Sequence, residues 1–115
     1  MSGLTTHVLD IANGCPAAGV RIELRRLDGA VPVLLKTVST NANGRTDVPL
    51  LDAAEARAGQ YELAFHVGEY YAAKTGARPT FLDVVPVRFG IADPGEHYHV
   101  PLLVAPWSYT TYRGS

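Results

Sequence analysis

The stretch that decides the fold is Val20-Arg21-Ile22-Glu23-Leu24-Arg25-Arg26-Leu27, written VRIELRRL. Up to Arg25 its apolar residues alternate with charged ones, which is the period of a β-strand with one face buried and the other in water. An amphipathic helix would instead repeat its apolar residues every three to four positions. The stretch therefore predicts a half-buried strand.

Similar runs recur on both sides of it. They either alternate in the same way or are rich in leucine and β-branched residues, which favour strands. Asn-Gly, Asp-Gly and Asp-Pro-Gly turn signals separate them at the spacing typical of a β-sandwich. We expect further strands at Leu4–Leu9, Val33–Ser39, Tyr61–Val67, Val85–Ile91, His97–Val104 and Ser108–Tyr112.

Only two short segments favour a helix. Asp52–Ala58 (DAAEARA) is composed of good helix formers, and Glu69–Thr75 (EYYAAKT) is followed by Gly76, a residue common just beyond a helix end. The pattern as a whole predicts an all-β fold, an antiparallel β-sandwich of about eight strands, in a single domain over residues 1–115.

Composition excludes several classes of function. The 115-residue chain has 10 basic and 11 acidic residues and a net charge of −1, so no field attracts nucleic acid or an anionic membrane. No apolar run is long enough to span a membrane, and the start MSGLTTHVLD is unlike a signal peptide. The single cysteine, Cys15, cannot form an internal disulfide, and a small turn residue is the expected role for it. We expect a soluble, cytoplasmic protein with no nucleic-acid or membrane partner.

The stretch EHYHVPLL, residues 96 to 103, places two histidines two positions apart in an apolar run. In a strand, alternate residues share a face, so both histidines lie on one face and large apolar residues on the other. We expect the apolar set to face the core. Two apolar residues accompany the histidines on the outer face, which indicates that another subunit covers it. The core set is Tyr98, Val100, Leu102 and Val104, and the outer set is His97, His99, Pro101 and Leu103.

The residues alone leave the chemistry open. His97 and His99 could bind zinc together with His7, or they could simply be solvated or interfacial side chains. Arg45, in the turn NGRTD, presents a fork of donors suited to a planar, carbonyl-rich ligand, although a turn arginine is often only a surface residue. The terminal YRGS, Tyr112 to Ser115, combines an aromatic ring, a cation and a carboxylate that could line a pocket.

Four pieces of the chain together resemble one family. TTHVLD near the start, NGCPAAGV after it, NGRTD at mid-chain and EHYHVPLLVAPWSYTTYRGS at the end are similar to the transthyretin-related 5-hydroxyisourate hydrolase family. The resemblance runs from Leu4 to Ser115. It departs from the family pattern at Trp107-Ser108, where an aromatic residue followed by glycine is expected, but this position lies outside the motif residues.

The resemblance implies a transthyretin-like sandwich with one short helix, assembled as a homotetramer with its sites in a channel between dimers. It implies hydrolysis of 5-hydroxyisourate to 2-oxo-4-hydroxy-4-carboxy-5-ureidoimidazoline in purine catabolism, with no cofactor and no metal. A transthyretin-like carrier of small molecules, without catalysis, is the alternative. So is a zinc-dependent amidohydrolase.

The resemblance also assigns residues. The family's catalytic positions fall on His7, Arg45, His99 and Ser115, and its substrate-binding positions on His7, Arg45, Tyr112 and Arg113. His97 matches a motif position but receives no part of the chemistry.

Overall fold

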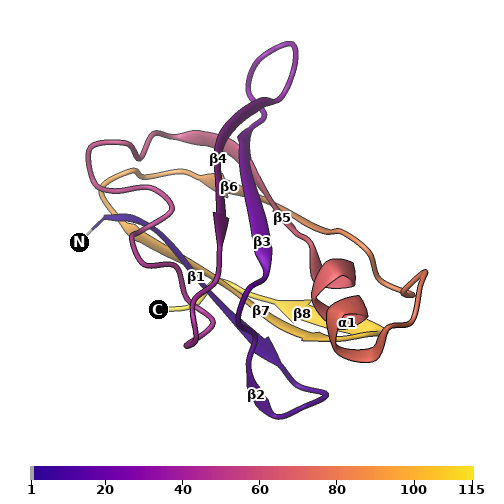
Figure 1. Ribbon diagram of the computed structural model, residues 1–115. Coiled ribbons are helices and arrows are strands. Elements are labelled where there is room, and N and C mark those ends of the chain that lie inside the picture. The colour runs from indigo at the N-terminus through magenta and orange to yellow at the C-terminus, as the bar shows by residue number, and fades with distance from the viewer. Residues whose placement is uncertain (1) are drawn as a thin grey trace.

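Two four-stranded sheets packed face to face form the chain, with one helix beside them (Figure 1). The computed structural model describes residues 2–115. One sheet has the strand order β2-β1-β7-β8 and the other β4-β3-β5-β6. The predicted all-β sandwich with one short helix is confirmed. The elements are β1 (Gly3–Asp10), β2 (Cys15–Pro16), β3 (Arg21–Arg26), β4 (Val33–Ser39), β5 (Gly59–Phe65), α1 (Val67–Thr75), β6 (Val85–Ile91), β7 (His97–Ala105) and β8 (Ser108–Thr111).

The pairing of β1 with β7 positions the site. These two strands run parallel, whereas the other strand pairs are antiparallel, so the predicted antiparallel arrangement has one exception. In this register Thr5 lies opposite His99 and His7 lies opposite Pro101. Because paired residues of neighbouring strands share a face, the histidines of both strands lie on the same side of the sheet.

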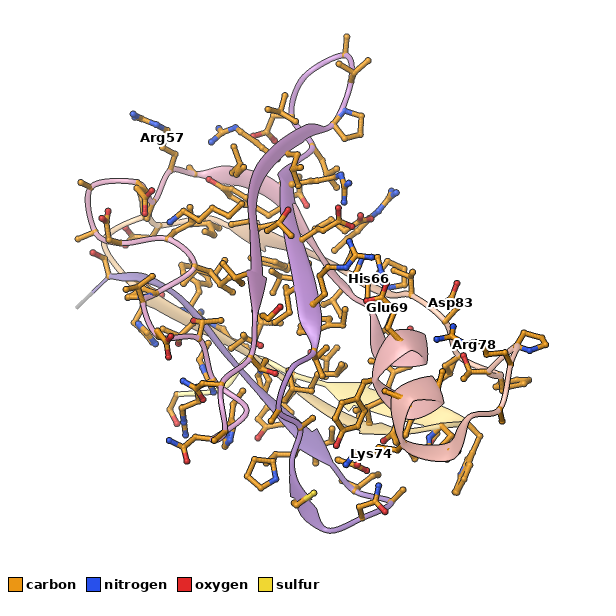
Figure 2. The ribbon with its side chains drawn as sticks, in the orientation of Figure 1. Arg57, His66, Glu69, Lys74, Arg78 and Asp83 are labelled. Atoms are coloured by element: carbon orange, nitrogen blue, oxygen red, sulfur yellow. The ribbon has the colours of Figure 1, made fainter. Side chains whose placement is uncertain are left out.

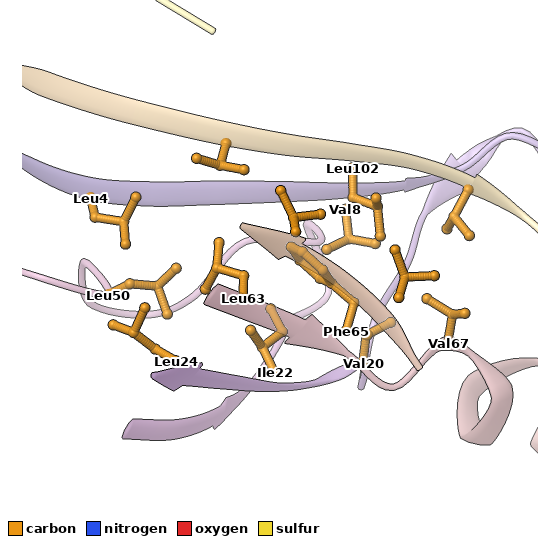
Figure 3. Packing of buried hydrophobic residues seen from close by; sticks show 14 of the residues in the cluster. Leu4, Val8, Val20, Ile22, Leu24, Leu50, Leu63, Phe65, Val67 and Leu102 are labelled. Atoms are coloured by element: carbon orange, nitrogen blue, oxygen red, sulfur yellow. The ribbon is translucent and has the colours of Figure 1, made fainter. Parts of the chain in front are cut away.

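The core lies between the two sheets (Figure 3). Ile22 and Leu24, the alternating apolar residues of β3, are fully buried there, as are Leu4, Val8 and Leu102 of the other sheet. The predicted core face of β7 is confirmed, since all four of its residues are buried and both histidines lie on the outer face. Pro101 is buried although it belongs to the outer face, whereas Leu103 on that face is half-buried.

The two helix predictions have different outcomes. Glu69–Thr75 is confirmed within α1, and Gly76 ends the helix in the left-handed conformation with φ 74°. Asp52–Ala58 is not a helix. The Asp52 amide donates to Glu55 Oε1 at 2.9 Å and the Glu55 amide donates to Asp52 Oδ1 at 2.8 Å, which closes a single turn. The prediction was wrong because β5 begins at Gly59 and leaves no length for more turns.

Two local features were less clear from sequence. The short strand β2, which contains the exposed Cys15, was not predicted. The unusual Trp107-Ser108 pair does not disturb the hairpin that it joins, since Ala105 pairs directly with Ser108. No helix within residues 2–115 is long and apolar enough to cross a membrane.

A buried carboxylate fastens the helix to β1. Asp10 is 1% exposed, and it accepts hydrogen bonds of 2.8 Å from the hydroxyls of both Tyr70 and Tyr71. Burial acts to raise the pKa of Asp10, but the hydrogen bonds from Asn13, Tyr70 and Tyr71 outweigh it and hold that pKa below its ordinary value. The carboxylate is therefore ionised in the folded protein and holds α1 against the end of β1.

Candidate active site

Three of the four histidines gather on the outer face of one sheet. His97 and His99 come from β7, and His7 comes from β1, beside the histidine strand. The fourth, His66, precedes α1 and lies away from them, where its Nε2 is 2.7 Å from Glu23 Oε1 of the other sheet (Figure 2). The parallel register therefore brings together residues that the sequence separates by about ninety positions.

A threonine hydroxyl joins the two histidines of β7. Thr5 Oγ1 lies 3.0 Å from Nε2 of His97 and 2.9 Å from Nδ1 of His99. The two rings are nearly parallel, with centroids 6.4 Å apart and 17° between their planes. Sequence reasoning missed Thr5 as a site residue. Only the register of β1 against β7 would have pointed to it.

A tight turn holds His7 and presents Arg45. The Nε2 atom of His7 donates to the carbonyl oxygen of Asn43 at 2.9 Å, and because a carbonyl only accepts, that nitrogen carries a proton. The Val8 amide donates to the Gly44 carbonyl at 2.8 Å. Gly44 has φ 74°, and a side chain there would collide with the Val8 carbonyl, so only glycine lets the turn lie this close to β1.

Arg45 and His97 line one cavity of about 300 Å³. Arg45 is exposed, so its guanidinium is accessible to a ligand. The other lining residues are Thr5, Thr6, Thr46, Asp47, Val48 and Pro49.

His99 is the histidine whose charge is most affected by this arrangement. Burial lowers its pKa below the ordinary 6.5, and the nearby charges of Arg45, His97 and His7 lower it further, against an opposing hydrogen bond to the backbone of Thr5. His99 is consequently neutral at neutral pH. Residues 2–115 make no hydrogen bond to its Nε2, which is not buried, so this atom is available to accept a proton.

The end of the chain folds back onto His99. The Gly114 amide donates to the His99 carbonyl at 2.8 Å, and the exposed Ser115 follows directly. The side chains of Tyr112 and Arg113 line a second cavity of about 330 Å³, and the Arg113 guanidinium donates to Glu96 and to the backbone carbonyl of His97. Within one chain the structure thus brings His7, Arg45, His99 and the terminal backbone together, but not the side chains of Tyr112 and Arg113.

The histidine geometry does not suit a metal ion. Nε2 of His97 and Nδ1 of His99 both face Thr5, and Nε2 of His7 is used by Asn43. Across residues 2–115 no three histidine, cysteine, aspartate or glutamate side chains are placed to hold a metal. The zinc alternative built on these three histidines therefore lacks a ligand set.

Comparison with known proteins identifies the family of this chain. The HIUase/Transthyretin family model matches residues 4–114. This chain belongs to that family. The chain is 58% identical to a 5-hydroxyisourate hydrolase of Mesorhizobium japonicum over 97% of this chain and 91% of that protein. The resemblance read from the sequence motifs is confirmed.

Solved structures of the family have the same fold. The 5-hydroxyisourate hydrolase of Klebsiella pneumoniae is 38% identical, with a TM-score of 0.81 over the full length of both chains. Sea bream transthyretin, in a complex with thyroxine, is 29% identical, with a TM-score of 0.86 over 96% of this chain and 93% of that one. The predicted transthyretin-like sandwich is confirmed.

Proposed function

We propose that this chain hydrolyses 5-hydroxyisourate to 2-oxo-4-hydroxy-4-carboxy-5-ureidoimidazoline, a step of urate degradation in purine catabolism. The observation that carries the proposal is a neutral His99 with an open Nε2 on the same face as His7 and near the charge of Arg45. The family relative from Mesorhizobium japonicum, which carries the name of this activity, supports it. No metal or cofactor has a role in the proposed reaction.

His99 is the proposed general base. Its Nε2 takes a proton from a water molecule as the water O–H bond breaks, and the hydroxide oxygen bonds to the ring carbonyl carbon under attack. The π electrons of that carbonyl move to its oxygen. When the tetrahedral intermediate collapses, the ring C–N bond breaks and the imidazolium returns its proton to the departing nitrogen. General-base catalysis of this kind contributes on the order of 100-fold or more to a rate.

Arg45 and His7 are the proposed partners of the base. The planar guanidinium of Arg45 binds the carbonyl oxygens of the substrate and stabilises the negative charge that develops on the attacked oxygen. His7, whose Nε2 is fixed by the Asn43 carbonyl, positions the water. Ser115, next to the residue that pairs with His99, orients the base or the water through its hydroxyl.

We propose that the working form is a homotetramer whose sites lie between subunits. Large apolar side chains on and beside β8 support this proposal, since Trp107 is 67%, Tyr109 42% and Tyr112 57% exposed. Tyr112 and Arg113 line the second cavity, which none of the three site histidines lines, so we assign their substrate contacts to the site of a neighbouring subunit. A cytoplasmic location is also proposed, and the exposed free thiol of Cys15 is consistent with a reducing compartment.

The decisive experiment follows the ultraviolet decay of 5-hydroxyisourate freshly made with urate oxidase. The wild-type protein should accelerate the decay, and His99→Ala and Arg45→Ala should each lose on the order of 100-fold in kcat/KM. Arg57→Ala is the matched control, because Arg57 is an exposed arginine that does not line the cavity of Arg45. Full turnover in both site variants would contradict the assignment.

The carrier alternative rests on the similarity to sea bream transthyretin. A carrier would bind a small aromatic ligand without accelerating the decay, and Arg45 and His99 would then affect only affinity. An unchanged spontaneous decay rate in the presence of the wild-type protein, combined with saturable binding of a urate analogue, would favour the carrier.

A further inference from the structure

Thr5 is a polar residue that the proposed reaction does not yet use, although its hydroxyl touches both histidines of β7. The contacts of 3.0 Å to His97 and 2.9 Å to His99 lie within the normal range of hydrogen bonds. Thr5 also lines the cavity that holds Arg45. Its position is fixed by the sheet itself, because Thr5 is paired directly with His99.

The surroundings of His97 determine where its proton lies. Its Nδ1 is buried and has no hydrogen-bond partner among residues 2–115. A proton on that atom would be a buried donor without an acceptor, which incurs the full desolvation cost of the group. We therefore assign the proton of neutral His97 to Nε2, from which it donates to Thr5 Oγ1.

The hydroxyl oxygen of Thr5 can accept a second hydrogen bond. It has two lone pairs and one hydrogen. If the second lone pair accepts from Nδ1–H of His99, then the neutral ring of His99 leaves Nε2 unprotonated. The hydroxyl hydrogen of Thr5 is then used by neither ring.

We propose that Thr5 is a positioning residue that accepts hydrogen bonds from Nε2 of His97 and Nδ1 of His99, and so keeps Nε2 of His99 free to act as the base. The proposal rests on the role of His99 proposed above. When Nε2 takes the proton from water, the Nδ1–H contact to Thr5 is retained, so the base needs no rearrangement between its neutral and charged forms. No bond at Thr5 breaks in the step.

Charged or titratable groups from three segments face His99 and affect its protonation. They are His7 from β1, His97 from β7 and Arg45 from the turn after β4. All three disfavour the imidazolium, whereas an acceptor for Nδ1–H favours it. Removal of the Thr5 hydroxyl should therefore move the acid limb of the rate profile to lower pH.

The test compares Thr5→Val, which keeps the shape without the hydroxyl, with Thr5→Ser, which keeps the hydroxyl. Thr5→Val should lose at least about 10-fold in kcat with little change in KM, and its acid limb should move to lower pH. Thr5→Ser should retain most of the wild-type kcat. Thr37→Val, at an exposed position of β4, controls for the general effect of replacing a strand threonine.

Nitrogen-15 NMR of the histidine rings provides a readout that needs no activity. In the wild type, His99 should carry its proton on Nδ1, and in Thr5→Val this preference should be lost. Wild-type kcat and acid limb in Thr5→Val, or a wild-type His99 protonated on Nε2 instead, would overturn the proposal. If the wild type failed to hydrolyse 5-hydroxyisourate, the proposed function would fail, and the NMR result would still decide the role of Thr5.

Discussion

The peptide N–H of Gly114 donates a 2.8 Å hydrogen bond to the carbonyl oxygen of His99, which places the end of the chain against the candidate base. A Cβ atom added at Gly114 would lie 2.6 Å from Cδ2 of the His99 ring. That distance is shorter than any van der Waals contact, so the absence of a side chain at position 114 lets the tail and the ring approach each other.

Gly114→Ala should therefore lower activity without unfolding the protein. The added methyl group displaces either the His99 ring or the tail, and small displacements of a catalytic group commonly cost up to about 100-fold in rate. Steady-state kinetics and thermal denaturation measured together would check this. Gly29→Ala is the control, since a Cβ there meets nothing closer than 3.5 Å, and equal activity of both variants would contradict the steric argument.

The pH dependence of the rate should reflect the lowered pKa of His99. Burial, followed by the charges of Arg45, His97 and His7, holds that pKa below 6.5, so the neutral base persists at pH values where an ordinary histidine is largely protonated. The acid limb of kcat/KM should accordingly lie below pH 6.5.

Arg45→Ala should move this acid limb to higher pH, in addition to lowering the rate. Removing a nearby cation makes protonation of His99 less unfavourable, so its pKa rises. Full pH–rate profiles of the wild type, Arg45→Ala and the control Arg57→Ala would test the sign. An acid limb that stays in place in Arg45→Ala would show that another group controls it.

The local patterns of the sequence predicted most of the fold but only part of the site. The alternation in β3 was sufficient to predict a half-buried strand, because one side of each sheet faces the core. Ile22 and Leu24 lie on that side. The helix prediction for Asp52–Ala58 was wrong because helix propensity does not indicate where the next strand begins. Thr5 was missed because its contacts depend on a parallel pairing of β1 with β7, which no local pattern specifies.

Tyr71→Phe should destabilise the fold. Its hydroxyl donates to Asp10 Oδ1 at 2.8 Å, and its oxygen lies 3.0 Å from the Val104 carbonyl oxygen. Removing a donor from a buried carboxylate costs about 1–3 kcal/mol of unfolding free energy, measurable by urea denaturation. Thr37→Val, which removes a hydroxyl on the exposed side of β4, should change stability little.

The difference in unfolding free energy between the wild type and Tyr71→Phe should also depend on pH. The lowered pKa of Asp10 contributes stability that is present above the ordinary value of 3.8 and is lost as the pH falls through the lower folded value. The gap between the wild type and Tyr71→Phe should thus narrow below pH 3.8. A gap that stayed constant into that range would mean that packing of the ring, rather than the hydrogen bond to the carboxylate, accounts for the effect.

An extension after Ser115 should impair catalysis while leaving the fold intact. Gly114 is held on His99 by its backbone, so residues added beyond Ser115 must pass close to the base. The comparison is between a chain with a short C-terminal tag and one released from a self-cleaving fusion that ends at Ser115. Equal activity of the two proteins, at equal thermal stability, would remove the terminus from the reaction and leave His99 oriented by Thr5 alone.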